Sequence, residues 1–104
     1  MIIEERDYRI KPGKIQKFVE TYEEAELPMQ KELLGEFLGY FTSEIGELNH
    51  DVALWRYEGL DDRLQRREKM VADERWHRYL DMVVELIDVQ NTLILRPTRF
   101  SPVQ

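Results

Sequence analysis

Residues 37–57 read FLGYFTSEIGELNHDVALWRY, and this stretch decides the fold. Two runs rich in aromatic and β-branched residues, 37–45 and 49–57, flank the turn-forming segment 46–48, a pattern that predicts an antiparallel β-hairpin. Gly39 lies within the first run, where a glycine indicates a β-bulge, a close approach of backbone or ligand, or simple packing beneath an aromatic ring. The other elements can be placed around this hairpin.

The segment before the hairpin predicts a strand followed by a broken helix. Ile2–Ile10 is rich in β-compatible residues and ends at residues 11–14 (KPGK), where proline and glycine favour a turn. Beyond the turn, apolar side chains recur at the spacing of one helix face: Ile15, Phe18, Val19 and Tyr22. Pro28 cannot continue regular helical hydrogen bonding, so we expect a break or kink there, followed by a short second piece that ends near Gly35.

The segment after the hairpin predicts two helices and a final strand. Residues 60–73 are highly charged and favour an exposed helix, in which Asp62 and Arg66 lie four residues apart and can pair. The next stretch carries an apolar helical stripe that should pack on the sheet: Trp76, Leu80, Val83, Val84 and Ile87. Thr92–Phe100 predicts the last strand, and Pro97 places its second half at an edge or a bulge.

The predicted order is strand, helix, strand, strand, helix, strand, which is the α+β, ferredoxin-like arrangement. A chain of 104 residues with 42% hydrophobic content forms one core, so residues 1–104 are predicted to be a single domain. In this arrangement helices cover one face of a four-stranded antiparallel sheet. A second copy that covers the other face is the simplest solution, so we expect a homodimer.

Short motifs at fixed separations are spread over nearly the whole chain. They are IEERDY at 3–8, IKPG at 10–13, GYF at 39–41, IGELN at 45–49, LWRY at 54–57, then Arg63, Arg67, Trp76 and Tyr79, and finally RP at 96–97 and FSP at 100–102. In this combination the sequence resembles the NIPSNAP family. The resemblance implies a dimeric α/β-barrel fold, whose superfamily also holds small cofactor-free monooxygenases and haem-degrading enzymes. Members of the family mostly lack an assigned activity, so the resemblance indicates the fold better than the function.

One departure from the family pattern concerns the third strand. Family members often carry histidine directly before the Leu-Trp pair, and this sequence has Ala53 there. Chemistry that depends on that imidazole is therefore placed in doubt. His50 is no ready substitute, because an odd separation puts it on the opposite face of the strand.

Composition excludes several classes of partner and cofactor. The formal charge of −6 opposes nucleic acid and anionic membrane surfaces. The chain has no cysteine, no apolar run of membrane-spanning length and no apolar signal core at its start, so we expect a cytoplasmic protein. Two histidines 27 residues apart make no metal site, and no phosphate-binding glycine loop or nucleophile motif is present. No metal or other cofactor is predicted.

The first strand supplies the candidate catalytic residues. Glu4, Arg6 and Tyr8 alternate along the strand and point to one face, which would carry an acid, a base and a phenol. If this face lies inside the barrel, the charged pair must be hydrogen-bonded, and it could then hold a polar group of a ligand. A structural ion pair that fixes the register or the dimer is the alternative, and it is the commoner role.

Aromatic residues supply the candidate ligand-binding surface. Tyr22, Tyr40 and Trp55 are predicted to line an apolar pocket, with His50 near its mouth, although an aromatic core is the commoner role of such residues. His77 has Arg75 and Arg78 near it, which favours exposure.

Two charged clusters are predicted to be solvated faces. The first is the acidic stretch 23–26 (EEAE), for which a metal site is the alternative. The second is formed by Arg63, Arg66, Arg67 and Lys69, for which an anion site is the alternative.

Three functions from different classes remain open. The first is a module that binds a small, largely apolar molecule or presents a dimer surface. The second is a cofactor-independent enzyme of the monooxygenase or isomerase type, with Glu4, Arg6 and Tyr8, or Tyr40, in proton transfer and orientation. The third, and least favoured, is haem binding, for which His50 or His77 would be the axial ligand.

Overall fold

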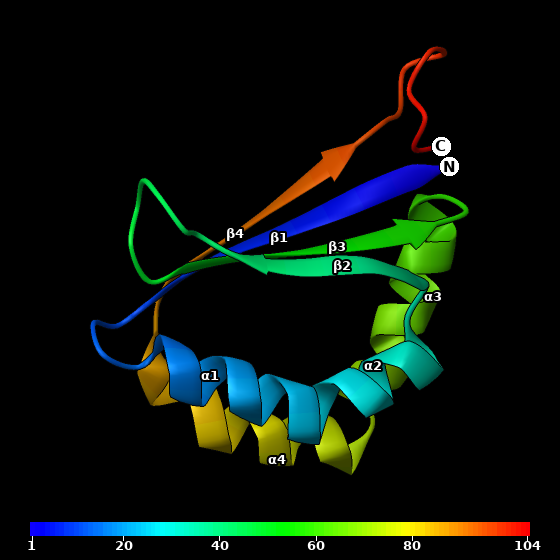
Figure 1. Ribbon diagram of the computed structural model, residues 1–104. Helices are drawn as coiled ribbons and strands as arrows, with labels where there is room; N and C mark the ends of the chain where they lie inside the picture. The colour runs from blue at the N-terminus through cyan, green and yellow to red at the C-terminus, as the bar shows by residue number, and fades with distance from the viewer.

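Four antiparallel strands form one sheet, and helices cover one of its faces (Figure 1). The computed structural model describes residues 1–104. Its strands are β1 (Ile2–Ile10), β2 (Glu36–Thr42), β3 (His50–Tyr57) and β4 (Ile87–Leu95), and they lie in the order β2-β3-β1-β4. The sequence prediction of a ferredoxin-like α+β fold is therefore confirmed.

The two central strands decide which side chains face the helices. In β3, burial alternates strictly along the strand, and the buried set is Asp51, Ala53, Trp55 and Tyr57. Antiparallel pairing places Glu4 opposite Trp55, and Arg6 opposite Ala53. Because directly opposed residues share a face, the candidate residues of β1 point toward the helices and away from the open face of the sheet.

A wide helical turn interrupts the first stretch of helix. This stretch consists of α1 (Ile15–Thr21), the π-helical segment η1 (Tyr22–Glu26) and α2 (Leu27–Leu33). The backbone N–H of Leu27 donates to the carbonyl of Tyr22, five residues earlier. Pro28 follows, has no N–H and would clash with a carbonyl one regular turn before it, which explains why the helix widens here. The helix is therefore distorted just before the proline, in line with the predicted break or kink, but it continues without interruption into α2, which ends at Leu33.

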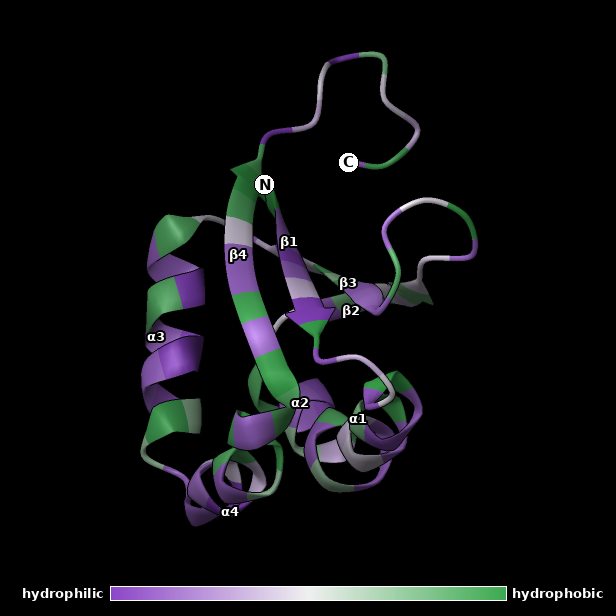
Figure 2. Cartoon of the chain, turned by 90° about the vertical axis from the view of Figure 1, so that its left-hand side faces the viewer, coloured by the Kyte–Doolittle hydropathy of each residue, from purple (hydrophilic) through white to green (hydrophobic).

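The second stretch of helix covers the same face of the sheet and consists of α3 (Leu60–Val71), α4 (Glu74–Val83) and the 3₁₀ turn η2 (Val84–Leu86). Asp73 caps α4 by accepting a hydrogen bond from the backbone N–H of Arg75 at 2.8 Å. In Figure 2, hydrophilic stretches of α3 alternate with hydrophobic bands at its two ends and in its middle. None of the helices combines the length and the apolar character that crossing a bilayer requires.

Two segments differ from the sequence prediction. Strand β4 begins at Ile87 and ends before Arg96 and Pro97, so the predicted strand over residues 92–100 started too late and extended too far. Phe100 lies in a turn and is 80% exposed. The hairpin loop is longer than predicted and contains two positive φ angles, at Gly46 and Asn49. Of the alternatives given for Gly39, a bulge is present, as a register shift between Phe37 and Gly39.

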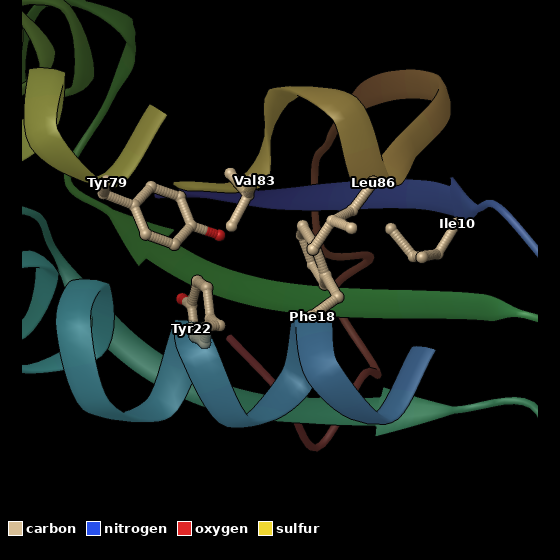
Figure 3. Close-up of a cluster of buried hydrophobic side chains, with 6 residues drawn as sticks. All are labelled: Ile10, Phe18, Tyr22, Tyr79, Val83 and Leu86. Carbon is tan, nitrogen blue, oxygen red and sulfur yellow. The ribbon is translucent and has the colours of Figure 1, made fainter. Parts of the chain in front are cut away.

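The core between sheet and helices has two parts. Figure 3 shows the first, in which side chains of α1, η1, α4 and η2 meet Ile10 at the end of β1: Phe18, Tyr22, Tyr79, Val83 and Leu86. The second lies toward α2 and α3 and contains Met29, Leu34, Ala53, Trp55, Tyr57 and Met70. The space between these two clusters is the candidate site.

Candidate functional site

A cavity of about 160 Å³ lies between the helix-covered face of the sheet and the helices that cover it. Its sheet wall is formed by side chains of all four strands, among them Arg6, Tyr8, Tyr40 and Asp51. Its helical wall comes from η1, α2, α3 and α4 and combines aromatic and aliphatic side chains with Glu26 and Arg67. The cavity therefore joins a mainly apolar lining to a few charged groups.

An arginine network at the sheet wall holds the acid of β1. Arg6 Nη2 donates to the hydroxyl of Tyr8 at 2.6 Å, and Arg6 Nη1 lies 3.5 Å from Glu4 Oε1. The other oxygen of Glu4 accepts from Arg63 Nε of α3. Glu4 is fully buried, so both of its oxygens have a guanidinium partner, as burial of a carboxylate requires. Burial lowers the pKa of Arg6, but Tyr8 and Glu4 outweigh it and hold the pKa above its usual value.

Arg67 of α3 lines the same cavity without a comparable partner. Its Nη1 atom is buried and makes no hydrogen bond. Burial lowers the pKa of Arg67, and the positive charge of Arg6 lowers it further. The guanidinium nevertheless stays charged, because arginine does not lose its proton in proteins. The cavity thus contains an unused cationic donor.

Glu26 ends the π-helical segment and is 3% exposed. Gln30 Nε2 donates to Glu26 Oε1 at 2.7 Å, while Gln30 Oε1 accepts from the Tyr22 hydroxyl at 2.5 Å. Burial raises the pKa of Glu26 to about 8, although Tyr79, Arg6 and Arg67 act in the opposite direction. The carboxyl group therefore holds its proton at neutral pH.

Asp51 of β3 is the second buried acid of the cavity, and it is 2% exposed. Its Oδ2 atom makes no hydrogen bond. Burial raises the pKa of Asp51 to about 7, while the Tyr40 hydroxyl and His50 lower it. An acid poised near neutral pH is suited to proton transfer.

Aromatic rings form the remaining wall. The rings of Tyr22 and Tyr40 lie 4.6 Å apart, and Tyr79 meets Tyr22 edge-on at 6.3 Å. The rings of Tyr79 and Trp76 are tilted to each other at 6.2 Å. Burial raises the pKa of Tyr22, Tyr40 and Tyr79 far above the usual value. These hydroxyls therefore remain protonated and act as hydrogen-bond donors as well as acceptors.

The structure brings together four of the candidate catalytic and ligand-binding residues predicted from the sequence. Arg6, Tyr8, Tyr22 and Tyr40 line the cavity, and Glu4 lies buried behind Arg6. The cavity lies between sheet and helices within one subunit, so the Glu4, Arg6, Tyr8 face does not point to a space between two sheets.

The other two predicted pocket residues lie elsewhere. Trp55 has no exposed surface and packs in the second core cluster, where its ring lies 5.0 Å from that of Phe37. His50 points to the open face of the sheet and binds Asp7. His77 is exposed, as predicted, and its Nε2 lies 2.8 Å from the carbonyl of Val71.

Three cavity residues were not predicted from the sequence. Glu26 and Arg67 were assigned to solvated faces, and Asp51 was not considered. Glu23 and Glu24 are exposed as predicted, but Glu26 is buried, so the interpretation of the whole acidic stretch as solvated was wrong for its last residue. Glu26 lies four residues after Tyr22 and therefore on the apolar face of the helix, and this position indicated that its side chain is buried. In β3, Asp51 alternates in step with Trp55 and was detectable in the same way.

The arginine cluster of α3 divides in a similar manner. Arg66 pairs with Asp62 at 2.7 Å, as predicted from their spacing, and also reaches the carbonyl of Leu34 at 2.9 Å. Arg63 and Arg67, one turn apart, face Glu4 and the cavity and are not part of a solvated face.

Comparison with known proteins now identifies the family. The NIPSNAP family model matches residues 3–102. This chain belongs to the NIPSNAP family. Protein NipSnap of Drosophila melanogaster is 33% identical over 103 residues, which cover 99% of this chain and 37% of that protein. This NIPSNAP chain thus spans little more than a third of that curated relative.

Solved structures agree with this assignment. Protein Atu4242 of Agrobacterium tumefaciens is 42% identical, with complete coverage of both chains and a TM-score of 0.97, and it is described as a NIPSNAP family protein with unknown function. An antibiotic biosynthesis monooxygenase is 16% identical over 94% of this chain and 99% of its own, with a TM-score of 0.69. The second likeness concerns the fold alone.

Proposed function

We propose that this NIPSNAP chain binds a small, largely apolar ligand in the cavity between sheet and helices. The observation that carries the proposal is the cavity itself, which is mainly apolar and is lined by a few buried polar groups from separate elements. Ligand sites in proteins have this composition, because apolar walls supply affinity and a few polar groups fix the orientation.

The size of the cavity limits the ligand to about one ring. An apolar cavity of about 150 Å³ accommodates benzene, and the cavity here measures about 160 Å³. The tilted ring pairs around Tyr22 offer edge and face contacts that suit a planar ring. Ala53 supports the same proposal, because its small side chain leaves room at the sheet wall.

Filling the cavity tests the proposal. Phenol, benzyl alcohol and 4-hydroxybenzoate serve as ring-sized probes, with binding measured by thermal shift and by shifts of the tyrosine ring resonances in NMR spectra. Ala53→Leu should weaken probe binding at least tenfold, whereas Ala72→Leu makes the same chemical change at an exposed site and should not. If no ring compound binds the wild-type chain, or if Ala53→Leu binds as tightly as wild type, the proposal is refuted.

A second candidate function is proton transfer without a cofactor, in an enzyme of the isomerase or monooxygenase type. Two buried acids in one cavity favour it: burial raises the pKa of Glu26 to about 8 and that of Asp51 to about 7. Groups with pKa values near the working pH are efficient general acids and bases. Arg6 and Tyr8 would orient a carbonyl or hydroxyl group beside them.

Exchange of carbon-bound protons tests this second function. The wild-type chain should accelerate deuterium incorporation at the CH₂ carbon of phenylpyruvate, which lies next to its ketone, followed by NMR in D₂O. Removing a general base costs about 10²-fold to 10⁴-fold in rate, so Glu26→Gln or Asp51→Asn should show such a loss, and Glu24→Gln at an exposed position should not. Equal exchange with and without protein would leave binding as the function.

Haem binding has little support. Neither histidine lines the cavity, because His50 lies on the open face and His77 on the exposed side of α4. The structure therefore offers no axial histidine at this site.

We also propose that the chain works as a homodimer through the open face of its sheet. That face carries exposed apolar side chains: Phe41, Val89, Leu93 and Leu95. Charges of both signs, such as Glu5 and Arg9, lie between them. A two-fold interface must be self-complementary, and a face with both apolar and oppositely charged groups meets this requirement.

Sedimentation velocity at micromolar concentration tests the dimer. Wild type should sediment as a dimer, and Leu93→Glu, which puts a charge on the open face, should sediment as a monomer. Met82→Glu changes a similarly exposed side chain on α4 and should remain dimeric. A monomeric wild-type chain would refute the proposal.

A further inference from the structure

We propose that the ligand of this cavity is a ring-bearing monoanion, a carboxylate above all, whose charge is held by Arg67 with help from Arg6. The inference rests on the proposed binding function and deepens it by naming the chemical class. It begins from Arg67, which lines the cavity and has a buried Nη1 atom without a partner. A buried cationic donor without a partner is unfavourable, and a carboxylate is the partner that fits its planar fork.

Glu4 is not available as a partner, because both of its oxygens are already paired. Glu4 Oε1 faces Arg6 at 3.5 Å, and Glu4 Oε2 accepts from Arg63. Two guanidinium groups, those of Arg6 and Arg63, therefore hold this carboxylate, and Arg67 has no ionic bond although the charge of Glu4 acts on its pKa. The local charge is positive even though the whole chain carries −6. Preference for an anion must then come from this site, since the overall field opposes anions.

The other two acids are mostly protonated below neutral pH and so supply little of the missing negative charge there. Glu26 accepts a hydrogen bond from Gln30, and burial raises its pKa to about 8. Asp51 sits on the sheet wall, and burial raises its pKa to about 7. In their protonated forms both can donate a hydrogen bond to a ligand, which an anion would accept.

Tyr8 adds a second donor beside the arginines. Its hydroxyl oxygen accepts from Arg6 Nη2 at 2.6 Å, so its own hydrogen is free to be donated. The carboxylate end of a ligand can thus meet a guanidinium and a phenol, while its ring lies among the tyrosines of the helical wall. One charged group and one ring match both the polarity and the volume of the cavity.

A matched pair of ligands separates charge from shape. We would titrate 4-hydroxybenzoate and its neutral amide, 4-hydroxybenzamide, into the full chain by isothermal calorimetry at pH 6.5. Wild type should bind the anion at least tenfold more tightly than the amide. The preference should persist in 0.5 M NaCl, because a buried ion pair is screened much less than exposed charges.

Two variants locate the preference. Arg67→Gln should weaken binding of the anion at least tenfold and change binding of the amide by less than threefold. Arg78→Gln removes the same charge from an exposed position on α4 and should leave both affinities unchanged. The same calorimetric traces report whether each variant still binds the amide, so a folding defect is recognised directly.

Several results would overturn the inference. Equal affinity of wild type for anion and amide would do so, as would an equal loss of both ligands in Arg67→Gln or loss of anion preference in Arg78→Gln. If neutral rings bind but the anion does not, the inference fails and the proposed binding function stands. If no ring compound binds, both fail.

Discussion

Replacing Glu26 by glutamine should stabilise the chain, and increasingly so as the pH rises. Glutamine keeps a carbonyl oxygen for the hydrogen bond from Gln30 and cannot ionise. Burial raises the pKa of Glu26 to about 8 in the folded chain, against 4.5 for an unperturbed glutamate. Between these values the folded chain binds one more proton than the unfolded chain, so the free energy of unfolding falls as pH rises.

The magnitude follows from the two pKa values. Each pKa unit corresponds to about 1.4 kcal/mol, so the loss of stability caused by Glu26 is about 3 kcal/mol at pH 7 and approaches about 5 kcal/mol above pH 9. Glu26 is 3% exposed, so solvent screening reduces this figure little. The difference in unfolding free energy between Glu26→Gln and wild type should widen by about 3 kcal/mol between pH 5 and pH 8.

Urea unfolding followed by tryptophan fluorescence at pH 5, 6, 7 and 8 measures this difference. Asp51 titrates in an overlapping range, but it is present in both proteins and cancels in the comparison. Glu24→Gln, two residues earlier and exposed, is the control and should show no such trend. A difference that stays constant within about 1 kcal/mol across this range would show that Glu26 is ionised in the folded chain, and the reasoning about this buried acid would fail.

Two further predictions concern packing. Trp55→Ala empties a fully buried position in the second core cluster and should lower the free energy of unfolding by about 3 to 5 kcal/mol in urea titrations; a loss below 1 kcal/mol would contradict the packing described. Gly35→Ala would place a methyl group against the backbone carbonyl of Arg56 and should cost about 1 to 3 kcal/mol. Gly59→Ala meets open space, so it should cost less than about 1 kcal/mol even though Gly59 is the N-cap of α3, and equal melting temperatures of the two alanine variants would contradict this.

Local sequence patterns predicted most of the helices and strands, because each of these patterns fits only one type of element. Ile2–Ile10 was predicted with its observed bounds, since the turn-forming residues that follow leave a strand no way to continue. Strand β4 was misplaced because Ile87 continues the apolar helical stripe of α4 equally well. A short apolar run fits the periodicity of a helix and that of a strand equally well. Only the pairing of Ile87 with Ile10 in the folded chain decides for the strand.

The site was harder to predict because its charged members depend on tertiary contacts. Glu26 and Arg67 look like ordinary surface residues within charged stretches of sequence. Each becomes a cavity residue through the helix that carries it, and the two helices meet only in the folded chain. Tyr22 and Tyr40 were predictable, because aromatic side chains on an apolar face are expected to be buried.

The π-helical segment joins the cavity to the hydrophobic core in a single stretch of backbone. Tightening it to a regular helix without deleting a residue would turn everything that follows by roughly a quarter of a turn, because a π-helical turn takes up about one residue more than an α-helical turn. Met29, now fully enclosed, would leave its place at the same time as Glu26 left the cavity. Ligand preference and folding are therefore tied together along this segment, and new specificities are more readily gained by changing the strands opposite it.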